Sequence, residues 1–188
     1  MFKKISIITL LVIISGAAYY YIQTNKKSQA NIEIKKFLSE GDKYVPFTLK
    51  NLKGEKIDTK NLKGKVLFIN FWATWCAPCK QEMPSMQALY EKLNKEFPNK
   101  FEMLAVNIDT QDVPLVVQMY ALDLKLKFPI LLDTNGTIKS KYNTTGVPET
   151  FIIDKRGVVS KIDIGAVDWG KPENYEYIKR LLQEKLNS

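Results

Sequence analysis

The chain has 188 residues, of which 45% are hydrophobic and 26% are charged; this is typical of a globular domain with some additional sequence. It contains two cysteines and no histidine, which excludes Ser-His-Asp and Cys-His catalysis and metal sites built on histidine. The net charge is +8, but residues 1–39 carry +5 of it and residues 40–188 only +3. The domain therefore has no basic cluster that would predict nucleic-acid binding.

The first feature along the chain is the uncharged segment ISIITLLVIISGAAYYYI at residues 5–22, which lies between two pairs of lysines. As a helix it would measure about 27 Å, close to the thickness of a bilayer core, with its tyrosines at the interface. We favour an N-terminal signal anchor over residues 1–24, followed by a linker over 25–39. A cleaved signal peptide, cut after a small residue near 18 or 30, and a buried core helix are the alternatives. The anchor predicts one pass through a bacterial cytoplasmic membrane with the domain outside, and cleavage would leave the domain free there.

Residues 40–188 alternate between predicted strands and predicted helices, which indicates an α/β domain with a largely parallel sheet and a final antiparallel hairpin. The run VLFINFW predicts a central strand buried on both faces. Pro84 predicts a kink in the first long helix. The expected strands are 44–50, a short piece before 62, 66–72, 101–108, 128–132, 150–154 and 158–164, and the expected helices are 77–97, 114–122, 137–142 and 172–186.

The motif Trp75-Cys76-Ala77-Pro78-Cys79 directly follows the buried strand and begins the long helix. Free N–H groups and the partial positive charge at a helix N-terminus stabilise a thiolate, which is the reactive form of cysteine. Pro78 lacks an N–H, which costs nothing in the first turn. We expect Cys76 to be the more exposed nucleophile and Cys79 to resolve the mixed disulfide. A purely structural disulfide and a zinc site shared between subunits are the alternatives.

The segment FWATWCAPCKQEMP resembles the active-site segment of the thioredoxin superfamily, above all its membrane-anchored extracytoplasmic TlpA/ResA/CcmG (DsbE) branch, and GVPETFIID matches a second family segment. The resemblance covers about residues 40–188. It implies a thioredoxin-like fold, with a central mixed sheet flanked by helices, an N-terminal hairpin and a helix–strand insertion over 114–132. It also implies a cis peptide before Pro148, which would present the Val147 backbone to a substrate chain. Pro84 matches the family pattern too.

The resemblance also draws attention to polar residues near the cysteines. Asn70 stands where thioredoxin has a buried, titratable Asp, and an Asn cannot take over that proton transfer. Glu82 lies three residues after Cys79, so we predict a partly buried carboxyl with a raised pKa that moves the proton of Cys79; an exposed surface charge is the alternative. Glu149 either contacts substrates or is a surface strand residue. We expect Trp75 to form an exposed lip for partners.

The resemblance implies an extracytoplasmic thiol-disulfide oxidoreductase that needs no cofactor or metal besides its two cysteines. We favour a reductase of protein disulfides of the cytochrome c maturation type, supplied with electrons by a membrane protein. A disulfide oxidase or isomerase for exported proteins is the main alternative, since the residues between the cysteines do not fix a reduction potential. A peroxidase is disfavoured because Cys76 lacks the Pro-x-x-x-Thr-x-x-Cys context, and a thiol-based binding module, such as a copper carrier, lacks a histidine.

Overall fold

The structure is a computed structural model that describes residues 14–22, 38–110 and 114–185. The chain divides into two units, residues 1–37 and residues 38–188. Residues 14–22 are helical, but within the described ranges no helix has both the length and the apolar character needed to cross a bilayer. The rest of the predicted span, residues 5–13, and linker residues 25–37 lie outside the described ranges.

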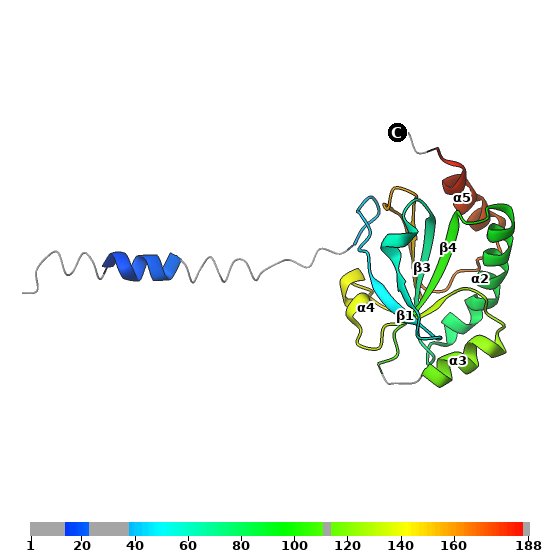
Figure 1. Cartoon of the computed structure of the whole chain (residues 1–188), viewed down its shortest axis with the longest axis horizontal. Helices are drawn as coiled ribbons and strands as arrows, with labels where there is room; N and C mark the ends of the chain where they lie inside the picture. The colour runs from blue at the N-terminus through cyan, green and yellow to red at the C-terminus, as the bar shows by residue number, and fades with distance from the viewer. Residues whose placement is uncertain (1–13, 23–37, 111–113, 186–188) are drawn as a thin grey trace, which may run out of the picture. The chain divides into compact units, whose positions relative to one another are not determined.

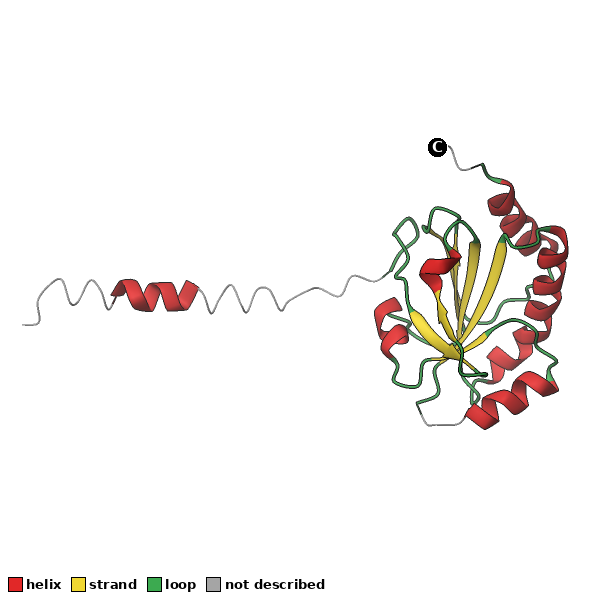
Figure 2. Ribbon diagram, in the orientation of Figure 1, coloured by secondary structure: helices red, strands yellow, loops and turns green. Residues whose placement is uncertain are grey.

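The second unit contains the predicted alternation of strands and helices (Figures 1 and 2). The strands are β1 (Thr48–Asn51), β2 (Lys56–Asp58), β3 (Val66–Trp72), β4 (Phe101–Asn107), β5 (Ile130–Leu132), β6 (Glu149–Ile153) and β7 (Val159–Ile164). The helices are the 3-10 helix η1 (Thr59–Leu62) and the α-helices α2 (Ala77–Glu96), α3 (Pro114–Asp123), α4 (Thr137–Tyr142) and α5 (Pro172–Gln183). Helix α2 continues as one element through Pro84.

Several predicted elements differ from the observed ones; the last helix, expected over 172–186, ends at Gln183, where the Glu184 N–H donates to the Arg180 carbonyl. The strand expected at 44–50 begins only at Thr48, because the preceding residues pair instead with the β6–β7 turn, where the Tyr44 N–H donates to the Gly157 carbonyl at 3.0 Å. The extended piece expected before residue 62 ends at Asp58, whose carboxylate accepts the Lys60 N–H and starts the 3-10 helix. Strand β5 starts two residues later than expected, after Pro129.

The seven strands form one mixed sheet in the order β2-β1-β5-β4-β3-β6-β7. Strands β5, β4 and β3 are parallel, whereas β1 and β2 at one edge and β6 and β7 at the other are antiparallel to their neighbours. The mixed sheet, the N-terminal hairpin β1–β2 and the helix–strand unit α3–β5 are confirmed, whereas the largely parallel sheet expected from the alternation is wrong, because only β3–β4 and β4–β5 pair in parallel. In Figure 1, α2, α3 and α5 lie on one side of the sheet and α4 on the other.

Strand β3 is buried along its whole length, as its apolar sequence predicts. Its alternating side chains pack on opposite faces: the Phe71 ring lies 5.2 Å from Tyr142 of α4, and the Trp72 ring lies 6.2 Å from Tyr120 of α3. Among the described residues the buried hydrophobic core extends from Phe47 to Leu182. Residues 38–188 thus contain a complete core of their own.

Candidate active site

The two cysteines lie where β3 passes into α2, and they form a disulfide with Cα atoms 5.3 Å apart. Cys76 is the N-cap of α2, and its Sγ accepts a hydrogen bond from the Cys79 backbone N–H at 3.2 Å. The same N–H group and the helix N-terminus can stabilise a Cys76 thiolate after reduction. Cys79 is fully buried and Cys76 is 4% exposed, so the expected order is confirmed, although Cys76 is itself buried.

A buried carboxylate that the sequence reasoning missed holds the segment leading into the motif. Asp109, just beyond the end of β4, accepts the Thr74 backbone N–H at 3.1 Å and the Asn107 side-chain amide at 2.9 Å. Because β3 and β4 are parallel, their carboxyl ends meet at the same edge of the sheet. An acidic residue directly after a buried strand was the signal that could have identified it.

Behind the cysteines, Glu82 and Asn70 form a buried polar network. Glu82 is 3% exposed, so the surface-charge interpretation is wrong. Its Oε1 accepts the Asn70 Nδ2 at 2.8 Å, and its Oε2 accepts the Val167 backbone N–H at 3.1 Å. Asn70 Nδ2 also donates to the Thr150 Oγ1 of β6 at 2.9 Å. Neither Thr150 nor Val167 was expected here, because both come from strands or loops far away in sequence.

The environment of Glu82 changes its acidity in the predicted direction. Burial raises the pKa of its carboxyl from 4.5 to about 6, against the opposing hydrogen bonds from Val167 and Asn70. A carboxyl with this pKa exchanges its proton readily near neutral pH. It lies one helical turn after Cys79 on the same helix.

The loop before β6 reaches the same edge of the sheet as the cysteines. Strands β3 and β6 are antiparallel with Phe71 opposite Glu149, so the residues before Glu149 lie beside the end of β3. The peptide bond between Val147 and Pro148 is cis, as the resemblance implies. Pro148 is buried and Val147 half-buried.

Glu149 was expected to be a substrate contact or a surface strand residue, and the surface interpretation is wrong because its side chain is 4% exposed. Its Oε2 accepts the Thr145 backbone N–H at 2.9 Å, which ties the start of β6 to the loop that contains Val147. Burial raises the pKa of the Glu149 carboxyl, although hydrogen bonds from residues 145 and 146 lower it. Phe71 of β3 lies opposite Glu149 in the sheet, and both residues are buried.

The rim of the site is apolar and exposed. Trp75 is 69% exposed, as predicted, and Ile164 at the end of β7 is 71% exposed. The Lys80 Nζ lies 4.2 Å from the centre of the Tyr120 ring, which ties α3 to the start of α2. Helix α3 also exposes large apolar side chains that the sequence reasoning treated only as helix-forming: Leu115, Val116, Met119 and Leu122. Pro78, within the first two positions of α2, and Pro84 are exposed.

The arrangement can carry out thiol-disulfide exchange: a Cys76 sulfur at a helix N-terminus that is slightly more exposed than Cys79, a fully buried second sulfur, and a carboxyl of raised pKa one helical turn further on. Within the described ranges no cluster of three or more Cys, His, Asp or Glu side chains could hold a metal ion.

Comparisons with known proteins agree with this chemistry. The model of the AhpC/TSA family matches residues 41–162. The chain is 38% identical over 169 residues to the thioredoxin-like protein YneN of Bacillus subtilis, covering 89% of this chain and 93% of YneN. It is 34% identical over 175 residues to the thiol-disulfide oxidoreductase ResA of Bacillus cereus, covering 93% of this chain and 94% of ResA.

Solved structures share the fold of residues 38–188. A putative thiol:disulfide interchange protein DsbE from Chlorobium tepidum superposes with a TM-score of 0.64 at 27% identity, covering 77% of this chain and 96% of the solved one. StoA from Bacillus subtilis superposes with a TM-score of 0.59 at 28% identity, covering 74% of this chain and 97% of the solved one. These solved chains have about the extent of the second unit.

Proposed function

The chain belongs to the AhpC/TSA family of thioredoxin-like proteins and is a thiol-disulfide oxidoreductase, and we propose that it works as a membrane-tethered, extracytoplasmic reductase of protein disulfides. The observation that supports reduction of substrates, as opposed to oxidation, is the buried Glu82 carboxyl one helical turn beyond Cys79. Its negative charge opposes a second negative charge on the Cys79 sulfur. A dithiol whose thiolate is disfavoured gives up its electrons more readily, which favours the disulfide form of this protein and reduction of its substrate.

The reaction follows from the geometry. The Cys76 thiolate attacks one sulfur of the substrate disulfide, so that a Cys76–substrate bond forms and the substrate S–S bond breaks; the released substrate thiolate takes a proton. Cys79 gives its proton to the Glu82 carboxylate and attacks the Cys76 Sγ. The Cys76–substrate bond breaks as the Cys76–Cys79 disulfide forms, the second substrate thiolate takes up a proton from solvent while Glu82 releases one, and the substrate leaves as a dithiol. Two electrons pass to the substrate, and a dithiol donor must return them.

The recognition of protein substrates follows from the rim of the site. The cis Val147–Pro148 segment lies at the edge that an extended substrate strand can join. Trp75, next to Cys76, and Ile164, which pairs with Glu149, are exposed and provide apolar contacts for a substrate chain. Glu149 holds the loop that contains Val147 in place and does not contact the substrate, because its carboxylate is buried and already accepts hydrogen bonds.

The tether and the substrate class are inferred from the sequence. The uncharged segment at residues 5–22 is suited to a single-pass anchor that would hold the domain on the outer side of the membrane. Tethering raises the effective concentration of the domain near a membrane-bound electron donor. The resemblance to ResA and CcmG adds the substrate class, apocytochrome c before haem attachment.

Trapping tests this function. In the Cys79→Ser variant the mixed disulfide on Cys76 cannot be resolved, so disulfide-linked substrates accumulate and can be identified by mass spectrometry. Thiol alkylation of the wild-type protein in acid-quenched cells reports its steady-state redox form. A reductase is found mostly as the dithiol with apocytochrome c among the trapped partners. Mostly oxidised protein with newly exported proteins trapped would instead support the oxidase or isomerase alternative.

A further inference from the structure

A cavity of about 310 Å³ lies at the edge of the sheet opposite the cysteines. Its walls come from three segments that are distant in sequence: residues 43–46, residues 60–67 before and within β3, and residues 153–157 at the β6–β7 turn. Strand β3 begins beside this cavity, and the cysteine motif follows its other end. Seven strand residues at about 3.3 Å each separate the two places by roughly 20 Å.

The floor of the cavity is apolar and structurally fixed. It includes the side chains of Tyr44, Leu62, Leu67 and Ile153. The Tyr44 hydroxyl donates to the Thr59 carbonyl at 3.1 Å, which holds the ring in place. Gly157 has a φ of +76°, and a Cβ there would come within 3.2 Å of the Tyr44 ring. A glycine is required for the turn to pack this closely against the tyrosine.

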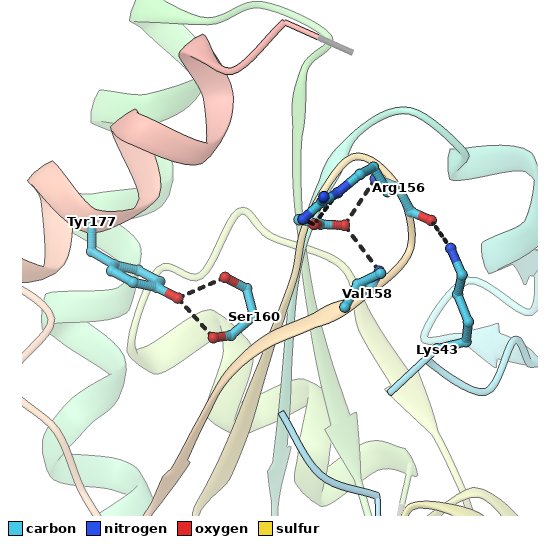
Figure 3. A network of polar contacts seen from close by, with 6 residues as sticks. Lys43, Arg156, Val158, Ser160 and Tyr177 are labelled. Carbon is cyan, nitrogen blue, oxygen red and sulfur yellow. Dashed lines mark hydrogen bonds and ion pairs between the residues drawn. The ribbon is translucent and has the colours of Figure 1, made fainter. Parts of the chain in front are cut away.

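The rim is strongly positive. Six cationic residues line the cavity, namely Lys43, Lys60, Lys63, Lys65, Lys155 and Arg156. The one acid among the lining residues, Asp154, is already neutralised: it pairs with Arg156 at 2.6 Å and accepts the Val158 N–H at 2.9 Å (Figure 3).

Three of the six cations, Lys65, Lys155 and Arg156, have structural partners, and the other three are available to a ligand. Lys65 pairs with Glu102 at 3.4 Å, and the Lys155 ammonium binds the last carbonyls of α5. Lys43 donates to the Arg156 carbonyl at 2.8 Å (Figure 3), which uses one of its three N–H groups. In the described part of the chain no ion pair involves the exposed Lys60 or Lys63.

An apolar floor under a ring of ammonium groups fits a ligand that joins an anionic head to an apolar body. We propose that this cavity binds the phosphate headgroup of an anionic phospholipid. Lysine is a common phosphate-binding residue, and the glycerol backbone and first carbons would lie against Tyr44 and Leu62. Two sources could supply the phosphate, a lipid or a free phosphate ester, and the lipid is favoured by where the chain enters the domain.

The chain enters the domain beside this cavity. The Gly41 N–H donates to the Val159 carbonyl at 2.8 Å, and Lys43 pairs with Val158. Only 15 residues, 23–37, separate the uncharged segment from the domain, and they can reach at most about 50 Å. This step rests on the proposed membrane tether. A headgroup in the cavity would hold this end toward the bilayer and the cysteines roughly 20 Å farther out, facing their substrates.

Vesicle binding by the isolated domain tests the proposal, because residues 38–188 hold a complete core and have the extent of solved relatives. The domain is sedimented with vesicles of phosphatidylcholine alone and with vesicles that also contain phosphatidylglycerol. We expect binding only to the anionic vesicles. Two lysines near an anionic surface contribute about 1 kcal/mol each, so Lys60→Gln with Lys63→Gln weakens the partition coefficient about 30-fold.

The matched control is Lys53→Gln with Lys95→Gln, which removes the same charge from exposed positions that do not line the cavity. It should keep wild-type binding. Equal loss in both double variants, or no binding by the wild type, would overturn the proposal. Free sn-glycerol 3-phosphate at matched phosphate concentration distinguishes the sources: if it shifts the Lys60 and Lys63 amide resonances with the affinity of the vesicles, the ligand is a free ester and the lipid assignment is wrong.

Reduction of a soluble protein disulfide, measured without vesicles, separates this inference from the proposed function. The cavity lies far from Cys76, so the Lys60→Gln, Lys63→Gln variant should reduce the substrate at the wild-type rate. Intact exchange without vesicle binding would reject the lipid site alone. Vesicle binding without reductase activity would reject the proposed function and leave the lipid site standing.

Discussion

The side-chain nitrogen of Asn70 lies 2.8 Å from Glu82 Oε1 and 2.9 Å from Thr150 Oγ1, whereas the oxygen of the same amide is buried without a partner. The two N–H groups of the Asn70 amide therefore donate to the Glu82 carboxylate and to the Thr150 hydroxyl. This network connects β3, α2 and β6 directly behind the cysteine pair. The protonation of Glu82 should therefore affect both the stability of the fold and the rate of exchange.

Replacing Glu82 by Gln should flatten the pH dependence of stability. Because the pKa is 4.5 in the reference state and about 6 in the fold, the folded protein binds the proton more tightly. The free energy of unfolding should fall by about 2 kcal/mol as pH rises from 4.5 to 6 and level off above that. Denaturant titrations across this range measure the slope. It should disappear in Glu82→Gln and persist in Glu176→Gln, an exposed control on α5.

The same Glu82→Gln variant should exchange disulfides more slowly at neutral pH, because Cys79 loses its proton acceptor. The rate profile of the wild type should contain a group that titrates near 6, and the variant should lack it. Stopped-flow measurement of the two profiles checks this. Identical profiles would mean that another base serves Cys79.

Replacing Asn70 by Asp should place a second carboxyl against Glu82. Two carboxylates about 3 Å apart cannot both ionise at low cost, so the pair should retain one proton at neutral pH. We expect the free energy of unfolding at pH 8 to fall by roughly 1–3 kcal/mol and to recover as the pH is lowered to 5. A loss that is the same at both pH values would instead indicate a packing defect.

Glu149 should matter for protein substrates more than for small ones. Glu149→Ala removes the acceptor of the Thr145 N–H and loosens the loop that carries Val147. The loss of this charge-assisted hydrogen bond should raise KM for a protein disulfide substrate about tenfold and should raise KM for a small disulfide less. Thr145→Val is the control, since it keeps the backbone N–H and removes only a 3.5 Å hydroxyl contact. Equal loss with both disulfides would contradict a loop-positioning role.

Trp75 and Trp72 should give opposite results when each is replaced by Ala. Trp72 is fully buried, and its removal should cost about 3–5 kcal/mol of stability. Trp75 is 69% exposed, so its removal should leave the melting temperature nearly unchanged and weaken binding of protein substrates. Calorimetry and exchange kinetics on the two variants separate the roles. A large fall in stability for Trp75→Ala would remove it from the proposed rim.

Much of the fold could be predicted because strong local patterns mark it. The buried β3 and the helices over Ala77–Glu96 and Thr137–Tyr142 lie within a residue of their predicted bounds. Strand ends were less predictable, because pairing depends on distant partners: residue 44 has a strand-like pattern but pairs with the β6–β7 turn. The short 3-10 helix η1 was not predicted, because its four residues show no hydrophobic periodicity.

The cysteines of the site were predictable from a short motif, but their surroundings were not. Glu82 follows Cys79 on the same helix, so its proximity could be inferred from helical spacing. Its partners Thr150 and Val167 approach only through the long-range register of β6 and the chain after β7. The burial of Glu149 depends on the same register, which places it opposite Phe71. Such contacts between residues that are distant in the chain cannot be predicted from local sequence patterns.

The reduction potential of the Cys76–Cys79 pair shows whether the protein is a reductase of protein disulfides. Residues 38–188 are equilibrated with defined thiol–disulfide buffers at neutral pH, and the oxidised fraction is read by alkylation. A reductase should have a potential of about −270 mV or lower, the range of reductants such as thioredoxin. A value of about −120 mV, typical of a strong oxidant, would contradict the reductase function and assign the protein to disulfide formation.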